Sequence, residues 1–373
     1  MDLSAVRYVG LDLGKRLFSL QLQDAEGRDL GARGLRRGEL LDFFATLPAC
    51  TVAMEACAGA GYWCEQLAAL GHRPLPLHPR AVSRLRLGHK NDQRDAALIL
   101  VAARLPDARP AIVKSREQTA VLSLHRTREL VIKSEVSSSN QVLGFLLEMG
   151  SVRWKSAAEL RRATPEEVDD EVDGMPEAMR LSVRSGVSRM RSAHAEQLKV
   201  AKALRRWHDG NSRSRRLAEV PGISYLAASA LAASIPDPSP WPSGRAFAAF
   251  LGLVPVQHST GGLQRLGHIG SGGDKYLRRT LFLVAWSAAM NCYRTSSGPA
   301  SLVSLLERKH FYVAITAHAA RLARTCCQML TDGVDFEERP AWRVTAFRGK
   351  GDTAAGRGGE TRRVIEPDLH PEP

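Results

Sequence analysis

The chain has 373 residues, of which 44% are hydrophobic, and a formal net charge of +13. This length predicts two or three domains, and the apolar share is large enough to build folded cores. The excess of positive charge favours a polyanionic partner, and the absence of an apolar run of about 20 residues excludes a membrane-spanning helix.

The cysteines and the N-terminus indicate where the protein works. The six cysteines form no CxxC pair and have no histidine partner at zinc spacing. The first residues lead directly into a predicted strand, without the apolar segment of a signal peptide. We therefore expect reduced, mostly buried thiols, a cytoplasmic protein, and nucleic acid rather than a membrane as its partner.

The N-terminal residues carry the pattern of an α/β domain. Residues 6–23 alternate apolar and polar side chains on either side of Gly14, which predicts a β-hairpin. The elements expected after the hairpin are a helix over 37–47, a strand at 51–54, a helix opened by residues 59–61, a strand at 74–77 and a helix over 96–105 that begins at Asp92. The order β-β-α-β-α-β-α predicts a mixed sheet covered by helices.

Four carboxylates stand at the ends of these elements. Asp12 and Glu55 each end a predicted strand, and Asp92 and Asp95 lie one helical turn apart. Cleavage of phosphodiesters with two Mg²⁺ ions about 4 Å apart requires several carboxylates that converge from different elements. Neighbouring strands of one sheet bring Asp12 and Glu55 together, so the set predicts a divalent-metal site that faces a polyanion.

These carboxylates also have plainer explanations. Asp92 and Asp95 match a variant of the capping box at a helix start, Asp12 suits a turn, and Glu55 suits a solvated strand end. A strand followed by Asp12-Leu13-Gly14 also begins the fold of sugar kinases and heat-shock ATPases. That fold requires a second such loop and a Gly-rich adenosine motif, which the sequence lacks in a suitable context.

Helical patterns fill most of the remaining chain. Residues 115–207 repeat apolar side chains every 3.5–3.6 positions, with breaks at Pro165 and Pro176. This pattern fits an antiparallel coiled-coil arm or an ordinary helical bundle. Residues 211–340 predict a further helical domain with Gly-rich loops, and residues 346–373 have a composition that cannot bury a core.

Two features of the C-terminal part suit contact with DNA. The segment 217–223, with Gly222 at its turn, resembles a helix-hairpin-helix that offers backbone N–H groups to a phosphate; a plain helix–helix turn is the alternative. Lys275, Arg278 and Arg279 share one face of a helix that follows a Gly-rich loop. A helix N-terminus with such a face suits a phosphate backbone, and a solvated basic face is the alternative.

A possible nucleophile lies between these features. Ser259 stands among glycines after a short apolar helix at 247–253, where the backbone can approach a ligand closely. A hydroxyl nucleophile needs activation and stabilisation of the developing charge. A surface loop rich in Ser, Thr and Gly is the alternative explanation.

Taken together, these motifs resemble the DEDD insertion-sequence transposases. The resemblance covers residues 6–335 and includes ordered blocks in both halves of the chain. The matching segments are Gly10–Lys15, Met54–Ala56, Lys90–Ala96, Pro221–Ile223, Gly252–Pro255 with Ser259, and Gly273–Arg278.

The resemblance implies an α/β RNase H-like (RuvC-like) N-terminal domain over 1–110, a helical coiled-coil arm over 111–208 and a mainly α C-terminal transposase domain over 209–345. The tail over 346–373 is expected to be disordered. By the same resemblance the acidic tetrad Asp12, Glu55, Asp92 and Asp95 binds Mg²⁺, and Ser259 attacks DNA to form a phosphoserine link. The implied partners are donor and target DNA, a structured guide RNA and further copies of the chain in a dimer or tetramer, in a bacterial, nucleoid-associated protein.

The chain departs from the family pattern near the last block. Gly270-Ser271-Gly272 stands where basic residues are usual, which makes Ser271 a rival nucleophile, and Thr260-Gly261 follows Ser259 in place of Ser-Gly. Two other functions remain open at this point. One is a RuvC-like endonuclease that hydrolyses branched DNA with water, and the other is a non-catalytic scaffold that binds nucleic acid.

Overall fold

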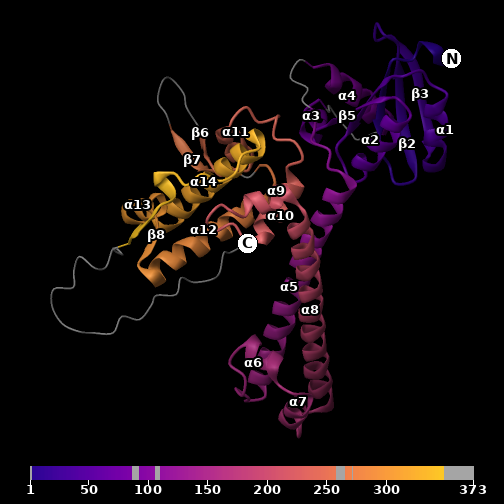
Figure 1. The fold of residues 1–373 in the computed structure, drawn as a ribbon. Helices are drawn as coiled ribbons and strands as arrows, with labels where there is room; N and C mark the ends of the chain where they lie inside the picture. Colours follow the sequence, from indigo (N-terminus) through magenta and orange to yellow (C-terminus); the bar gives the residue numbers. More distant parts are fainter. Residues whose placement is uncertain (1, 86–91, 106–109, 258–264, 271, 348–373) are drawn as a thin grey trace. The chain divides into compact units, whose positions relative to one another are not determined.

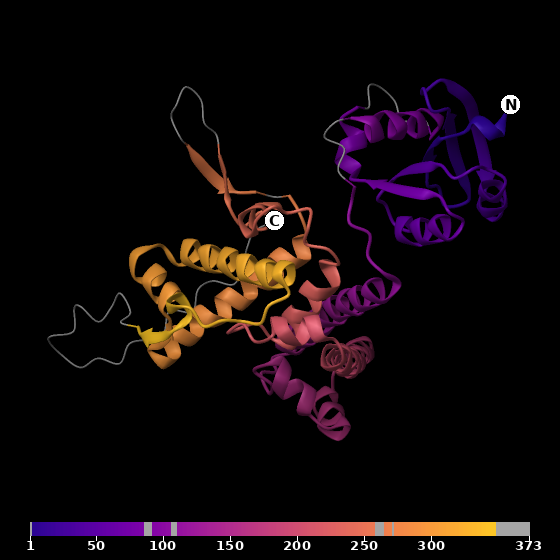
Figure 2. The same ribbon diagram turned by 45° about the horizontal axis from the view of Figure 1, so that its top comes forward.

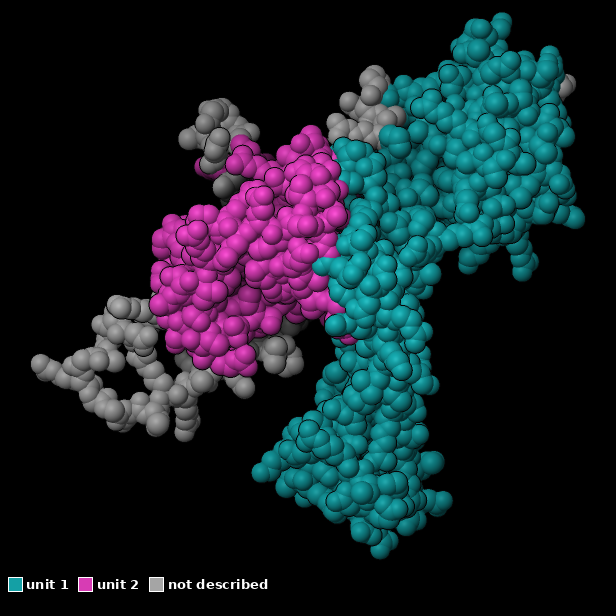
Figure 3. Space-filling model, viewed as in Figure 1, with its two compact units in different colours: residues 1–215, 228–240 teal, residues 216–227, 241–373 magenta. Residues whose placement is uncertain are grey.

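The computed structural model describes residues 2–85, 92–105, 110–257, 265–270 and 272–347. The chain divides into two compact units, residues 1–215 with 228–240, and residues 216–227 with 241–373 (Figure 3). Among the described helices, none is long and apolar enough to cross a membrane.

A mixed five-stranded sheet forms the N-terminal part of the first unit (Figure 1). Its strands are β1 (Tyr8–Asp12), β2 (Leu17–Gln23), β3 (Asp29–Arg36), β4 (Thr51–Glu55) and β5 (Arg73–Leu77). They lie in the order β3-β2-β1-β4-β5, with β2 antiparallel to β1 and β3, and with β1, β4 and β5 parallel. The carboxyl ends of β1, β4 and β5 therefore meet at one edge of the sheet.

Helices cover both faces of this sheet (Figure 2). They are α1 (Leu40–Ala45), α2 (Ala60–Ala69), α3 (Pro79–Ser83) and α4 (Asp92–Arg104), with short 3-10 helices at Leu3–Ala5 and Arg37–Glu39. Val9 and Val52 pack with α1 and α2 on one face, whereas Tyr8 and Ala53 pack with α4 on the other. This alternation is the two-residue period of a strand buried on both sides.

The predicted hairpin and the strands expected at 51–54 and 74–77 are confirmed, but β3 was not predicted. Its sequence, Asp-Leu-Gly-Ala-Arg-Gly-Leu-Arg, is mostly exposed and lacks an apolar alternation. It is an edge strand, held by its pairing with β2. Such a strand carries charge and glycine where a central strand carries core residues, so the local pattern did not reveal it.

Two long helices with two short ones between them follow the sheet in the first unit. The helices of this region are α5 (Arg116–Glu148), α6 (Ala157–Arg162), α7 (Pro165–Val172) and α8 (Glu177–Gly210). Gly186 of α8 packs so closely against Val142 of α5 that a Cβ atom on the glycine would overlap the valine side chain. Near the other end of the pair, Nε1 of Trp207 in α8 donates a hydrogen bond of 2.5 Å to Glu117 in α5. The two helices are therefore antiparallel (Figure 1).

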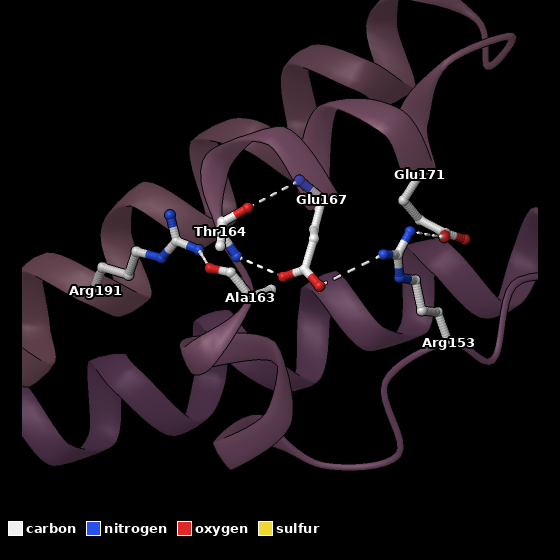
Figure 4. A network of polar contacts seen from close by, with 6 residues as sticks. All are labelled: Arg153, Ala163, Thr164, Glu167, Glu171 and Arg191. Carbon is white, nitrogen blue, oxygen red and sulfur yellow. Dashed lines mark hydrogen bonds and ion pairs between the residues drawn. The ribbon is translucent and has the colours of Figure 1, made fainter.

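Polar contacts fix the turn between these helices (Figure 4). Thr164 and Glu167 form a capping box at the start of α7, with N–H···O distances of 3.2 and 2.7 Å. Arg153 lies 3.6 Å from Glu167 and 3.4 Å from Glu171, and Arg191 of α8 donates to the carbonyl just before Thr164. Pro165 occupies the first turn of α7, where its missing N–H costs nothing, so the predicted helix break at this proline is confirmed.

The C-terminal part of the chain is mainly helical, with short strand pairs. Its helices are α9 (Ser212–Leu217), α10 (Tyr225–Ser234), α11 (Gly244–Phe250), α12 (Lys275–Thr295), α13 (Ala300–Arg308), α14 (Phe311–Asp332) and a 3-10 helix at Pro340–Trp342. Its strands are β6 (Pro255–Gln257), β7 (Leu266–Ile269), β8 (Ser297–Pro299) and β9 (Val344–Ala346). β6 pairs with β7 and β8 with β9, both antiparallel. The expected disordered tail, apart from residues 346 and 347, lies outside the described residues.

Candidate active site

Asp12 and Glu55 lie side by side at the acidic edge, which we define as the carboxyl ends of β1 and β4. Leu11 of β1 is paired with Met54 of β4, and each acidic residue follows directly in the chain. Adjacent strands are about 4.8 Å apart, and both residues are half-buried. Because side chains alternate, Asp12 shares the face of Tyr8 and Glu55 shares the face of Ala53, which is the face that α4 covers.

The thiol of Cys57 responds to the charge of both carboxylates. Its pKa lies above the usual value, first because of burial, then because of the negative charge of Glu55, with a smaller contribution from Asp12. Cys57 is an exposed cysteine, whereas the other five are buried, and all six are free. Two carboxylates from separate strands thus act on one point beyond the end of β4.

Helix α4 brings a third carboxylate to this edge. A Cβ atom on Gly10 would overlap the carbonyl oxygen of Ala96, and the guanidinium of Arg104 lies 4.6 Å from the ring centre of Tyr8. The helix therefore runs antiparallel to β1, with its N-terminus at the end that carries Asp12. Asp95 lies on this first turn and is only 4% exposed.

The other predicted site residues are placed less completely. Asp92 is the first residue of α4, but its side chain lies outside the described residues, as do Ser259 and Ser271. Among the side chains that the structure describes, no three acidic, histidine or cysteine groups come close enough to hold a metal ion. The structure thus places Asp12 and Glu55 at neighbouring strand ends and Asp95 on the first turn of α4, and the predicted metal site stays a prediction.

A cavity of about 560 Å³ adjoins the acidic edge. Cys57 lines it, together with Tyr62 from α2, Lys114 from the segment before α5 and Arg116, the first residue of α5. Arg116 is 2.6 Å from Glu65 and its guanidinium lies 5.8 Å from the ring centre of Tyr62. Sequence reasoning missed Lys114 and Arg116, and only their position shortly before a long predicted helix could have drawn attention to them.

In the second unit, Arg278 holds the base of the hairpin that carries Ser259. Strands β6 and β7 flank residues 258–265, so this segment connects the two strands. Nη1 of Arg278 donates to the carbonyl oxygens of Gly270 at 2.8 Å, Gly272 at 3.1 Å and Leu251 at 3.4 Å. A side chain predicted to bind nucleic acid thus makes structural contacts on both sides of the hairpin.

Two glycines allow this close packing. Gly252 has φ +70° and Gly273 has φ +77°, a region that L side chains rarely adopt. A Cβ on Gly252 would overlap the carbonyl of Gly270, and one on Gly273 would overlap the carbonyl of Phe250. These two glycines therefore allow the end of α11 to pack directly against the loop before α12.

The remaining predicted nucleic-acid contacts lie on the surface of the same unit. Lys275 and Arg279 are exposed on the first turns of α12, whose N-cap Asp274 accepts from two backbone N–H groups. Gly222 sits at the turn between α9 and α10 with φ +89°. A left-handed glycine is common where one helix ends and another begins, so this conformation fits both a helix-hairpin-helix and a plain helix–helix turn.

Comparisons with known proteins give the family. A model described as a transposase family matches residues 9–150, and the model of the transposase IS116/IS110/IS902 family matches residues 214–297. A probable family 20 transposase of Pseudomonas aeruginosa is 37% identical over 326 residues, which are 87% of this chain and 96% of that protein.

Two further relatives are transposases of insertion sequences. The transposase for insertion sequence element IS1328 of Yersinia enterocolitica is 33% identical over 335 residues, 89% of this chain and 99% of the relative. The transposase for insertion sequence element IS1111A of Coxiella burnetii is 29% identical and covers 87% of this chain and 90% of its own length. The chain therefore belongs to the IS116/IS110/IS902 family of transposases, enzymes that cleave and rejoin DNA to move an insertion sequence.

Proposed function

We propose that this transposase cuts and rejoins DNA through a serine nucleophile, Ser259, that works with a divalent cation held by the acidic edge. The observation that supports this most directly is the position of Asp12 and Glu55 at the adjacent carboxyl ends of the parallel strands β1 and β4, with Asp95 on the first turn of the helix that covers this face. The strand order, with β2 antiparallel and acidic residues at the ends of β1 and β4, also supports an RNase H-like (RuvC-like) domain.

The chemistry of these side chains fits Mg²⁺. Hard divalent cations prefer carboxylate oxygens, and the family of DEDD transposases generally uses divalent metal ions. Asp12, Glu55, Asp92 and Asp95 are the proposed ligands. A cation bound there supplies positive charge that stabilises the phosphoryl oxygens as negative charge develops on them.

The chain's own residues carry out the transfer. The hydroxyl oxygen of Ser259 attacks the scissile phosphorus, the bond from phosphorus to the sugar oxygen breaks, and the serine proton ends on that sugar hydroxyl. A sugar hydroxyl from a second DNA end then attacks the phosphoserine and regenerates the serine. Because each step exchanges one phosphoester for another, no nucleotide hydrolysis is required.

Cationic side chains of both units are the proposed contacts for the DNA backbone. In the first unit these are Lys114 and Arg116 at the cavity beside the acidic edge. In the second unit these are the exposed side chains of Lys275 and Arg279 and the exposed backbone of Gly222 at the turn between α9 and α10. Arg278 uses Nη1 for carbonyl oxygens but keeps further N–H donors for a phosphate.

The assembly and its partners follow from the same proposal. Synapsis of two DNAs requires at least a dimer, and the antiparallel pair α5 and α8 is proposed to be a coiled coil that helps to join copies of the chain. We also propose that a structured guide RNA is a partner, which the resemblance of the chain's motifs supports. The proposed domains are an RNase H-like domain over 1–110, a helical arm over 111–208, a transposase domain over 209–345 and a C-terminal tail.

A covalent protein–DNA adduct tests the serine mechanism. The full chain is incubated with Mg²⁺ and a plasmid that carries the element with its flanking non-coding DNA, and the products are denatured before electrophoresis. We expect an adduct for the wild type and for Ser239→Ala, a serine of an exposed loop, and none for Ser259→Ala. Full cleavage by Ser259→Ala without an adduct would favour hydrolysis by water, and loss of the adduct in Ser271→Ala alone would assign the nucleophile to Ser271.

A further inference from the structure

The second unit contains a cavity with no part in the proposed chemistry, and we call it the α14 pocket. It has a volume of about 430 Å³ and lies between α14 and the segment 334–342, which returns along that helix. The wall from α14 includes Arg321, Arg324 and Gln328, and the wall from the returning segment includes Phe336 and Trp342. Its volume falls within the range of small-ligand sites.

Two arginines in this pocket lack an anionic partner. The Nε of Arg321 is buried and has no hydrogen-bond partner, and neither Arg321 nor Arg324 pairs with a carboxylate of the described residues. The pKa of Arg321 is lowered, mainly by burial and further by the charge of Arg324, although a guanidinium stays protonated at any physiological pH. Both arginines are half-buried. An anion that enters the pocket would accept a hydrogen bond from the buried Nε of Arg321 and so satisfy a donor that has no partner there.

The opposite wall is aromatic. The rings of Phe336 and Trp342 are 5.8 Å apart in an edge-to-face arrangement, and Trp342 lies 5.7 Å from the ring of His318 beneath it. Trp342 is 4% exposed, so it forms the floor, and the half-buried Phe336 is closer to the entrance. An aromatic surface beside guanidinium groups suits a planar ligand with an anionic group.

Acidic residues limit the size of this anion. Asp332, Asp335 and Glu337 also line the pocket, and Asp335 is already paired with Arg216 at 3.0 Å. A long run of phosphates would meet these carboxylates and be repelled. A single phosphate at Arg321 and Arg324, with its organic group toward the aromatic wall, avoids them.

We propose that the α14 pocket binds one unpaired nucleotide of a nucleic-acid strand, with its phosphate at Arg321 and Arg324 and its base at Phe336 and Trp342. A base within a duplex is stacked and paired and cannot enter, so the pocket selects single-stranded or flipped-out nucleotides. The ligand chemistry is common to DNA and RNA. The site would hold a strand during recognition, independently of the carboxylates that act on the scissile phosphate.

Photochemical crosslinking tests this directly. The full chain is mixed, without Mg²⁺, with a single-stranded oligonucleotide that carries one 5-iodouracil, in a DNA form and an RNA form, and is irradiated and digested for mass spectrometry. We expect an adduct on the peptide that contains Phe336 or Trp342. A fully paired duplex of the same sequence should give a much lower yield of this adduct. The DNA and RNA arms show which strand the pocket prefers.

Variants distinguish the pocket from the general basic surface. Arg321→Gln should reduce this adduct about tenfold or more at limiting oligonucleotide, since it removes a hydrogen-bonded charge contact, whereas Arg321→Lys should retain part of it. Arg308→Gln, on the exposed surface of α13, removes the same charge and should leave the adduct unchanged. The variants are compared only after circular dichroism shows an unchanged helix content.

Several outcomes would overturn the proposal. They are adducts only on other peptides, an equal yield with Arg321→Gln, and an equal yield with duplex. The same assay in an Asp12→Ala background separates the two proposals. If Asp12→Ala abolishes DNA cleavage but the adduct still forms, nucleotide binding in the α14 pocket is independent of the acidic edge.

Discussion

Gly10 of β1 lies directly beneath Ala96 of α4, so close that a Cβ atom on the glycine would overlap the alanine carbonyl oxygen. The Cγ of Leu100 would be only 2.8 Å from the same atom. The missing side chain therefore sets the distance between helix and sheet. Because Asp95 precedes Ala96 and Asp12 ends the strand of Gly10, this contact also sets the depth at which α4 carries Asp95 relative to the strand that carries Asp12.

Substitution of Gly10 should affect both stability and activity. Gly10→Ala forces α4 away from β1, and overpacking of this kind costs about 1–3 kcal/mol of unfolding free energy. We also expect Mg²⁺-dependent cleavage to fall more than DNA affinity, because the carboxylates move and the basic surface does not. Urea unfolding and a plasmid-cleavage assay measure the two effects.

Gly38→Ala is the matched control, since a Cβ there meets no atom within 4 Å. Unchanged stability and cleavage in Gly10→Ala would show that α4 does not fix the geometry of the acidic edge.

Arg278 should act by positioning the hairpin β6–β7. Arg278→Gln removes the charged donor to the carbonyls of Gly270, Gly272 and Leu251, so we expect adduct formation to fall about tenfold or more, as for loss of a charged hydrogen bond. Lys275→Gln should instead weaken DNA binding, and the slope of log binding constant against log salt concentration should fall by about one, the value for one lost phosphate contact. Adduct yields at saturating DNA and binding isotherms at several salt concentrations separate the two effects. If Arg278→Gln loses affinity but reacts normally at saturation, the residue is a DNA contact.

The sequence revealed the acidic edge well and the positioning contacts poorly. Strand ends at Asp12 and Glu55 follow from alternation and turn chemistry, and a sheet then places them together. By contrast, the three carbonyls at Arg278 belong to residues 6–27 positions away, brought together only by tertiary packing. β3 was not predicted for a related reason: it is a strand because it pairs with β2, and its own composition does not indicate one.

His318 should make the second unit less stable in mild acid. Burial, and to a lesser degree the charge of Arg321, lowers its pKa from 6.5 to about 4. The unfolded chain therefore binds a proton between these values that the folded chain does not, so stability falls as the pH falls from about 6.5 toward 4. Between pH 7 and pH 5 the loss from this group is roughly 2 kcal/mol.

The variant His318→Leu removes this contribution, so its unfolding free energy should change less between pH 7 and pH 5 than that of the wild type. Urea unfolding at both pH values measures the difference. An identical pH dependence in His318→Leu would contradict the assignment.

Cys57 reports on DNA at the cavity beside the acidic edge. It is exposed while the other five cysteines are buried, so a maleimide should label it first in the folded protein. We expect duplex DNA to slow this labelling, and Lys114→Gln with Arg116→Gln to weaken the protection at a fixed DNA concentration. Mass spectrometry of the labelled peptide follows the rate, and labelling that DNA does not slow would place the duplex elsewhere.

The binding of a divalent cation by the acidic edge is the central claim, and Mn²⁺ titration followed by electron paramagnetic resonance tests it most directly. The full chain should bind Mn²⁺ in competition with Mg²⁺, and Asp12→Asn and Glu55→Gln should each weaken that binding about tenfold or more, as expected when a carboxylate ligand is lost. Asp42→Asn, an exposed carboxylate on α1, should bind as the wild type does. Equal Mn²⁺ affinity in Asp12→Asn, Glu55→Gln and the wild type would contradict the account.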